Sequence, residues 1–162
     1  KDTKPEKLSV CVLDRPRHNS IVKTLNEMGV KINFISDGDV SGVISVAYSK
    51  FNIDMYIGVG GGPEGVLAAA ALDCLGCQMQ TRLVLLDEKE INKAKKCGIK
   101  DIKKKYYIHD MVKGDVIFCA TGVTDGDLVK GIIDKNDFFE AETLVFHKST
   151  KTNKIIKNII KK

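Results

Sequence analysis

Short, almost wholly apolar runs alternate along this chain with stretches whose apolar residues recur at helical spacing, and this alternation most constrains the fold. The run at 8–13 is typical of a strand buried on both faces of a sheet. From Ser20 to Met28 the apolar side chains fall on one helical face, before Gly29. Such alternation predicts crossovers between parallel strands. We therefore expect an α/β fold, a layered αβα domain with a mostly parallel, mixed central sheet.

The remaining elements follow from the same periodicities. We expect strands at 30–35, 54–59, 82–86 and 116–120, helices at 40–48, 66–75 and 88–96, and antiparallel strands at 143–147 and 154–160. The alanine-rich helix at 66–75 should pack closely against its neighbours. The length of 162 residues fits a single domain over 1–162, in which the polar residues 1–7 act as a leader.

Composition excludes several classes of protein. With 43% hydrophobic and 29% charged residues, the chain is neither disordered nor fibrous. No apolar run approaches the roughly 20 residues that span a membrane, and the first residues lack the apolar middle of a signal peptide. The net charge of +5 comes from dispersed lysines, which argues against nucleic acid as a partner. We expect a soluble, cytoplasmic protein that binds neither nucleic acid nor membrane.

Arginine is scarce, which makes its position informative. The chain has three arginines, and two of them lie in the tripeptide Arg15-Pro16-Arg17. A local switch from lysine to arginine favours two-pronged binding of a phosphate or carboxylate, although chance clustering is the alternative.

The five cysteines, most of them inside apolar stretches, indicate a reduced, intracellular chain with buried thiols. Cys74 and Cys77 have the spacing of a redox or zinc pair, but no second pair accompanies them at ligand spacing. Packing is therefore the favoured role of both thiols.

Three loops follow the first three expected strands, at 14–18, 36–39 and 60–65. In an open α/β sheet, ligands bind outside the carboxyl ends of the strands. The chemistry is therefore expected at this one edge of the sheet.

The glycine loop at 60–62 lets a ligand approach the backbone, and the helix start behind it favours an anion. A purely structural tight turn before Pro63 is the alternative. Glu64 benefits from the helix dipole as any acidic residue in a first turn does, but it is also placed to bind a divalent metal ion.

Asp37-Gly38-Asp39 places two carboxylates around a flexible glycine. Such a pair can accept hydrogen bonds from sugar hydroxyls or bind a metal ion, while Asp39 alone can cap the helix that follows. Together with the two arginines, this pair suggests a polyol that carries phosphate.

Two further groups of residues receive no catalytic role. The segment 121–127 contains Thr124, Asp125 and Asp127, which can serve a metal or phosphate, but a turn followed by a helix cap is the favoured interpretation. His18 can act as a general base, yet no Ser-His-Asp spacing organises the three histidines.

Five segments occur in the order found in a known family: 10–18, 35–40, 60–66, 79–83 and 120–126. Over about residues 8–160 the chain resembles the class II fructose-1,6-bisphosphatases of bacteria. The resemblance implies the second half of a sugar-phosphatase-like fold and a hydrolase, a Mn2+- or Mg2+-dependent phosphatase of gluconeogenesis. It implies substrate contacts by Arg15, Pro16, Arg17, Asp37, Gly38, Asp39 and Gly61, and metal binding by Glu64.

Members of that family are about twice this long, and the other metal-binding carboxylates lie in an N-terminal half that this chain does not contain. We therefore expect the C-terminal half of a two-domain enzyme, with 1–7 as a linker remnant. Alone, it should bind fructose 1,6-bisphosphate, or sedoheptulose 1,7-bisphosphate, weakly and hydrolyse it negligibly. The resemblance also implies a homo-oligomer. The competing hypothesis is a non-enzymatic phosphosugar- or nucleotide-binding module.

Overall fold

The structure is a computed structural model and describes residues 3–162. Its N-terminal part is a three-stranded parallel sheet of order β2-β1-β3. The strands are β1 (Ser9–Leu13), β2 (Lys31–Ile35) and β3 (Met55–Tyr56). The predicted parallel crossovers are confirmed here, although β3 is shorter than the expected strand at 54–59.

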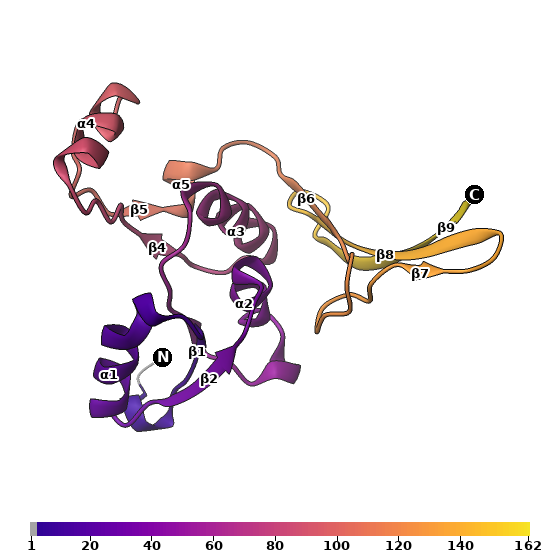
Figure 1. Cartoon of the computed structure of the whole chain (residues 1–162), viewed down its shortest axis with the longest axis horizontal. Helices are drawn as coiled ribbons and strands as arrows, with labels where there is room; N and C mark the ends of the chain where they lie inside the picture. The colour runs from indigo at the N-terminus through magenta and orange to yellow at the C-terminus, as the bar shows by residue number, and fades with distance from the viewer. Residues whose placement is uncertain (1–2) are drawn as a thin grey trace.

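The central strand β1 is buried along its whole length, as its apolar sequence predicts. Val10 and Val12 pack against Leu25 of α1 (Asn19–Glu27) on one face. On the other face lies α2 (Asp39–Ser45), where a Cβ on Gly42 would come within 2.5 Å of the Ile35 side chain. Figure 1 shows these helices on opposite sides of β1 and β2. Glycine at 42 thus allows α2 to lie directly on the sheet.

The alanine-rich helix α3 (Gly62–Leu75) packs against α2 and buries Ala68, Ala69 and Ala71. It begins four residues before the expected start, because Gly61 is the N-cap and Pro63 occupies the first turn. Gly76 ends it with a positive φ of 68°.

The middle of the chain forms a separate group of short elements. It comprises β4 (Gln80–Thr81), α4 (Glu88–Lys96), β5 (Tyr106–Tyr107) and the short α5 (Ile108–Met111). The expected strand at 82–86 is wrong: β4 pairs with β5 before it, and 82–86 has no regular structure. No partner strand among residues 3–162 lies beside that segment, so it does not form a strand despite its strand propensity.

The C-terminal sheet is entirely antiparallel. It contains β6 (Ile117–Thr121), β7 (Ile133–Asp134), β8 (Phe138–His147) and β9 (Thr152–Lys161). The expected hairpin is confirmed: β8 starts five residues earlier than predicted and ends at His147 as predicted, and β9 is longer than predicted at both ends. The turn of the hairpin lies close to α3, where Lys148 forms an ion pair with Asp73, and its open end, with the C-terminus, extends away from the rest of the molecule (Figure 1).

The α/β class is confirmed, but the single mixed central sheet is wrong. The strand at 117–121 pairs antiparallel with β8 and does not join the parallel sheet, so residues 3–162 form three separate sheets. The assignment to a sugar-phosphatase-like fold stays a prediction. Three short 3-10 helices complete the chain, at Pro5–Lys7, Pro16–His18 and Ser49–Phe51. The first lies in the expected linker 1–7, of which residues 1–2 are outside the described part.

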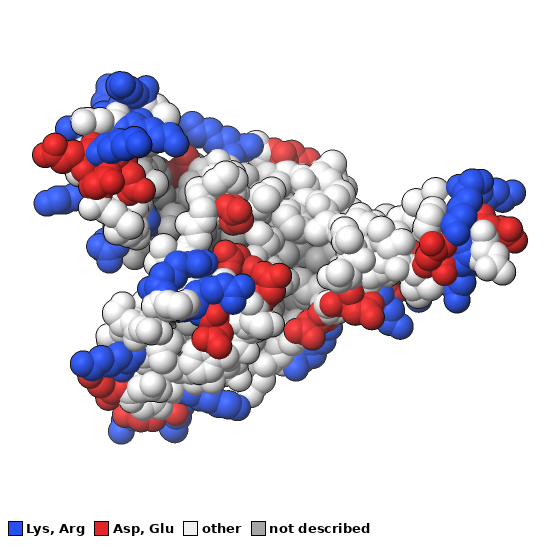
Figure 2. All heavy atoms as spheres, viewed as in Figure 1, with Lys and Arg blue, Asp and Glu red and all other residues white. Residues whose placement is uncertain are grey.

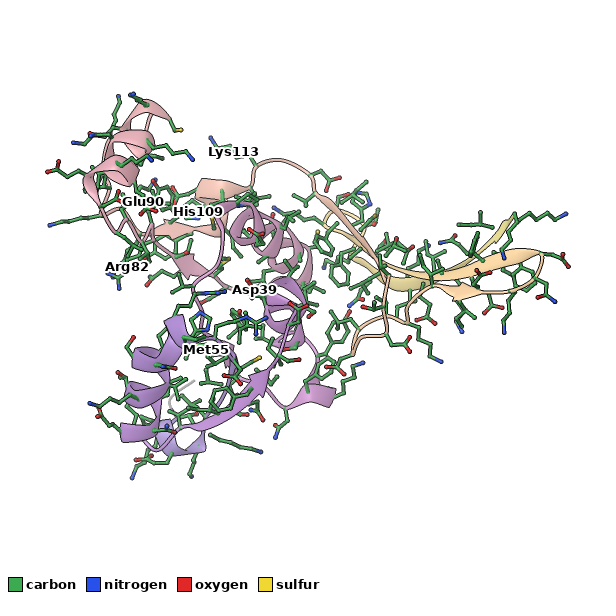
Figure 3. The ribbon with its side chains drawn as sticks, viewed as in Figure 1. Asp39, Met55, Arg82, Glu90, His109 and Lys113 are labelled. Atoms are coloured by element: carbon green, nitrogen blue, oxygen red, sulfur yellow. The ribbon has the colours of Figure 1, made fainter. Side chains whose placement is uncertain are left out.

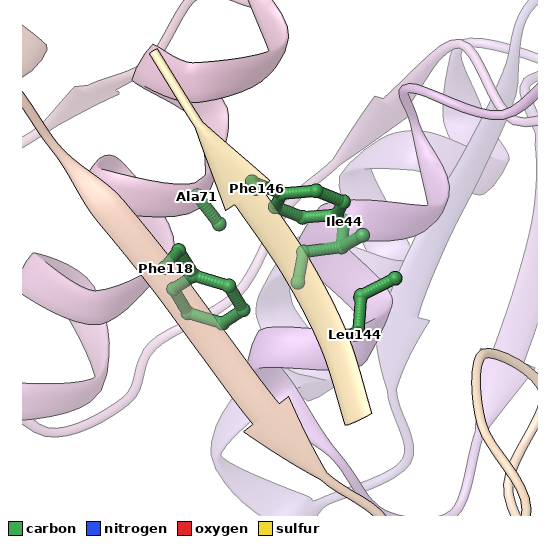
Figure 4. Close-up of a cluster of buried hydrophobic side chains, with 5 residues drawn as sticks. All are labelled: Ile44, Ala71, Phe118, Leu144 and Phe146. Carbon is green, nitrogen blue, oxygen red and sulfur yellow. The ribbon is translucent and has the colours of Figure 1, made fainter. Parts of the chain in front are cut away.

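One apolar cluster joins the C-terminal sheet to the helices α2 and α3 (Figure 4). Ile44 of α2 and Ala71 of α3 meet Phe118, Leu144 and Phe146 of the sheet. The rings of Phe118 and Phe146 are stacked, with centroids 5.6 Å apart. Within residues 3–162, no helix combines the length and the apolar character that a bilayer crossing requires.

Candidate functional site

The three predicted loops meet at one edge of the parallel sheet because β1 lies between β2 and β3. The loop after β1 contacts both of its neighbours. Arg15 Nη2 lies 4.0 Å from Asp37 Oδ1, after β2, and Arg17 Nε donates a 2.7 Å hydrogen bond to the carbonyl of Val59, after β3. The order of the strands therefore brings together arginines, aspartates and glycines that are far apart in the sequence.

The Arg15-Pro16-Arg17 segment presents two guanidinium groups at this edge. Pro16 begins the 3-10 turn that separates the two arginines. Arg15 Nη1 also donates to the Asp14 carbonyl at 2.8 Å. The side chains of Arg15 and Asp37 are 39% and 95% exposed, so their ion pair contributes little stability. Both groups thus remain accessible to a charged ligand.

Asp39 does not cap the helix that follows it, the alternative role considered for this residue. Gly38, at φ 86°, is the N-cap of α2, and no side chain caps that helix. The Gly38 amide donates to Asp37 Oδ1 at 2.8 Å, and the Ser41 hydroxyl donates to the Gly38 carbonyl at 2.8 Å. The helix start is therefore held by neighbours of Asp39, which leaves its carboxylate for other contacts.

Asp39 lies at the centre of the molecule (Figure 3). Its Oδ1 atom is buried without a hydrogen-bond partner in the described part of the chain. Burial first, and then the nearby charge of Asp39 and a hydrogen bond to it, raise the pKa of Tyr56 to about 12. An unpaired buried carboxylate oxygen is unfavourable by about 1–3 kcal/mol or more. A ligand that donates a hydrogen bond to Oδ1 would remove this penalty.

Asp39 and Glu64 line the same cavity, whose volume is about 450 Å³. Its other walls include Tyr56, Gly60 and Gly61, with residues 78–81 across from them. Figure 2 shows positive and negative side chains next to one another at the centre of this face. Arg15 and Arg17 are not in the lining; Arg17 lies close to it through Val59.

Tyr56 and residues 78–81 line the cavity but are not among the site residues predicted from the sequence. A tyrosine near the end of an otherwise apolar strand was the available signal for the first. Residues 79–81 lay within a motif of the resemblance, but nothing in their spacing indicated a role.

The Glu64 carboxylate folds back over the glycine loop, where a Cβ on Gly61 would collide with Glu64 Oε2. Carboxylate oxygens are the ligands that Mg2+ and Mn2+ prefer. Glu64 fits such an ion as one member of a donor set. Residues 3–162 contain no group of three or more His, Cys, Asp or Glu side chains placed to hold a metal. The donor set is therefore incomplete within residues 3–162.

The segment 121–127 lies outside the cavity lining and forms a turn, but no helix follows, so the predicted helix cap there is wrong. Asp125 Oδ1 accepts from the Gly131 amide at 2.9 Å, and the Gly122 amide donates to the Glu142 carbonyl at 3.0 Å. The first contact closes the loop on itself, and the second holds its start against β8. The structure thus supports a structural role for Asp125.

A cluster that the spacing did not reveal joins His147, Asp115 and Ser149. His147 Nε2 lies 2.8 Å from Asp115 Oδ2, and the Ser149 hydroxyl lies 3.0 Å from the same nitrogen. Because aspartate and serine share one ring nitrogen, the imidazole cannot relay a proton between them. Hydrogen bonds from His147 and Ser149 lower the pKa of Asp115 to about 2. The cluster fastens the turn of the hairpin.

The five cysteines are free thiols. Cys74 packs against the apolar cluster of Figure 4, and burial raises the pKa of both Cys74 and Cys77. Their surroundings fit the packing role that was favoured. The expectation of mostly buried thiols is wrong for Cys97 and Cys119, which are exposed.

Known proteins match this chain along nearly its whole length. It is 36% identical over 166 residues to the fructose-1,6-bisphosphatase class 2 of Haemophilus influenzae, with 94% of this chain and 50% of the relative covered. It is 33% identical over 171 residues to the D-fructose 1,6-bisphosphatase class 2/sedoheptulose 1,7-bisphosphatase of Synechococcus sp. (strain JA-3-3Ab), with 98% and 49% covered.

The chain therefore spans about half the length of the curated relatives it matches. The family model of the bacterial fructose-1,6-bisphosphatases encoded by glpX matches residues 1–160. By the extent of that match, the chain belongs to the glpX-encoded family of bacterial fructose-1,6-bisphosphatases.

Proposed function

We propose that this chain supplies the sugar-phosphate-binding half, and one metal ligand, of a phosphatase that hydrolyses the 1-phosphate of fructose 1,6-bisphosphate in gluconeogenesis. The observation that carries the proposal is the meeting of two arginines, two aspartates and a glycine loop at one sheet edge, beside a cavity of about 450 Å³. A sugar bisphosphate carries the anions and hydroxyls that this set of groups can bind.

Each group has a defined task in this proposal. Arg15 and Arg17 bind a phosphate group through their guanidinium N–H donors, and Pro16 sets the turn between them. Asp37 and Asp39 accept hydrogen bonds from sugar hydroxyls, and Asp39 Oδ1 offers an unused acceptor. Their separation across Gly38 lets the two carboxylates engage different hydroxyls.

Gly61 lets the ligand come close to the backbone at the start of α3, and Glu64 in the first turn of α3 is the metal ligand. A divalent ion, Mn2+ or Mg2+, would supply an activated water and neutralise charge on the phosphoryl oxygens. Because the donor set here is incomplete, we propose that the remaining carboxylates come from the other half of the enzyme. The isolated chain should then bind sugar phosphate weakly and hydrolyse it negligibly.

The remaining parts of the proposal are based on the relatives. We assign 1–162 to the C-terminal half of the enzyme, with 1–7 as the linker between halves. Sedoheptulose 1,7-bisphosphate is a second candidate substrate, because two of the relatives carry that activity in their names. The enzyme is proposed to be a cytoplasmic homo-oligomer; its free thiols fit a reducing compartment.

An amide NMR titration of the chain tests the binding step. Fructose 1,6-bisphosphate in the presence of Mg2+ should shift signals of 15–17, 37–39 and 60–64, whereas AMP should leave them in place. Equal or larger shifts with AMP would favour the nucleotide-binding module instead. Unchanged spectra at millimolar sugar bisphosphate would contradict a preformed half-site in this chain.

Mn2+ tests the role of Glu64, because the ion broadens the signals of nearby amides. With sugar bisphosphate present, Mn2+ should broaden residues 61–65 in the wild type, and Glu64→Gln should restore most of that intensity. Glu88→Gln is the matched control, since Glu88 also lies in the first turn of a helix but outside the cavity. Equal broadening in Glu64→Gln and the wild type would exclude Glu64 as a ligand.

A further inference from the structure

His18 is a polar side chain enclosed in the protein, with 1% of its surface exposed. Its Nδ1 atom lies 2.6 Å from the Leu13 carbonyl oxygen, and its Nε2 atom accepts a 2.9 Å hydrogen bond from the Val59 amide. A carbonyl can only accept and an amide N–H can only donate, so the proton of the ring must be on Nδ1. The backbone thus selects one neutral tautomer. In this tautomer the 3.2 Å contact of Nε2 with the Val59 oxygen is not a hydrogen bond.

The neighbouring residue completes the arrangement. Arg17 Nε donates to the Val59 carbonyl at 2.7 Å, so adjacent side chains bind both polar groups of one residue. The His18 amide donates to the Arg15 carbonyl at 2.9 Å, which closes the 3-10 turn that carries both side chains. We call these contacts the Val59 clamp.

The position of Val59 gives the clamp its importance. Val59 directly precedes Gly60-Gly61-Gly62, and two of these glycines line the cavity. Glycine has more backbone freedom to lose than any other residue, so a run of three glycines needs external contacts to hold one conformation. The Gly65 amide bonds to the Gly61 carbonyl at 3.1 Å, which anchors the far end of the loop in α3. The Val59 clamp anchors the near end.

We propose that His18 is a positioning residue: through the Val59 amide it fixes the glycine loop in the conformation that binds the sugar phosphate, without touching the ligand itself. The inference rests on the proposed function for the identity of the ligand. It also explains why a histidine follows the two arginines. Arg17 alone can hold only the carbonyl of Val59, and the imidazole supplies the acceptor that the N–H requires.

Two conservative variants separate the clamp from simple packing. In His18→Gln, the side-chain oxygen can reach the position of Nε2 and accept from the Val59 amide. In His18→Asn, the shorter side chain can still donate to the Leu13 carbonyl but cannot reach Val59. We expect His18→Asn to weaken binding of fructose 1,6-bisphosphate and to speed hydrogen exchange at the Val59 amide, each by about tenfold, which corresponds to about 1.4 kcal/mol. His18→Gln should recover most of both, and His109→Asn, on an exposed histidine, is the control.

The measurements are Kd from the NMR titration, amide exchange at Val59, and the 15N shifts of the His18 ring. The clamp requires a protonated Nδ1 and an unprotonated Nε2 in the wild type. A proton on Nε2, or equal exchange and binding in the Gln and Asn variants, would overturn it. If the wild type binds no sugar bisphosphate, the proposed function fails, and the ring tautomer and Val59 exchange still decide the clamp.

Discussion

Replacing Phe146 by alanine should lower the free energy of unfolding by about 3–5 kcal/mol, the range for a buried phenylalanine. Phe146 is fully enclosed, with 0% of its surface exposed. It lies in the apolar cluster that joins the C-terminal sheet to the helices, beside Ile44, Ala71, Phe118 and Leu144 (Figure 4). We expect the upper part of the range, because the cavity would be walled by residues of two helices and two strands that cannot all move inward.

Part of this loss belongs to the aromatic pair. The rings of Phe118 and Phe146 are stacked with centroids 5.6 Å apart, and such pairs contribute about 0.5–1.5 kcal/mol beyond their burial. A double-mutant cycle with Phe118→Leu and Phe146→Leu should therefore give a coupling free energy of that size, and a negligible value would exclude the stacking contribution.

Urea denaturation, followed by circular dichroism, provides the assay. Ile155→Ala is the matched control, because Ile155 pairs with Leu144 in the hairpin but is 48% exposed. Because about half of the Ile155 surface is buried, Ile155→Ala should lower the free energy of unfolding by about 1–2 kcal/mol. A loss below about 1 kcal/mol for Phe146→Ala, or equal losses in the two variants, would refute the view that this cluster holds the sheet to the helices.

Two further predictions concern single side chains. The folded pKa of Asp115, about 2, lies below the ordinary 3.8, so the stability it contributes is complete above pH 4 and disappears as the pH falls toward 2. The gap in urea midpoint between the wild type and Asp115→Asn should therefore shrink from pH 6 to pH 2, and a constant gap would contradict this linkage. Exposed Cys97 and Cys119 should react with a thiol reagent faster than Cys74 and Cys77, because burial raises the pKa of the latter two thiols. Peptide mapping after brief labelling measures this order, and faster labelling of Cys74 or Cys77 would contradict the prediction.

The parallel half of the fold could be predicted because its signals are local. The run at 8–13 is typical of a doubly buried strand, and β1 is such a strand. The helix that follows was expected to end before Gly29, and α1 ends at Glu27, with Gly29 at a φ of 72°. Sheet membership could not be predicted this way. Residues 117–121 have the composition of a buried strand, but their partner is chosen by long-range pairing with β8. Likewise, 82–86 has high strand propensity and no partner in the described part of the chain.

For the site, too, local signals were predictable from the sequence and the contacts of individual side chains were not. The position of three loops directly after the strands of a parallel sheet was enough to predict that Arg15, Asp37 and Gly61 lie at one edge. The contacts of Asp39 were not predictable, because its freedom from capping depends on a backbone conformation at Gly38. His18 was considered only as a base, since nothing in a sequence reveals that both ring nitrogens meet backbone atoms.

The central position of β1 has a consequence for synthesis on the ribosome. Of the three parallel strands, β1 is synthesised first, and its neighbours β2 and β3 end at Ile35 and Tyr56, so its second edge stays open until more than forty further residues have been added. At about 5–20 residues per second, that interval lasts a few seconds. During it, an apolar segment with free backbone groups is exposed to other nascent chains. Slowing translation between β2 and β3 should therefore increase aggregation of this protein more than slowing it after α3.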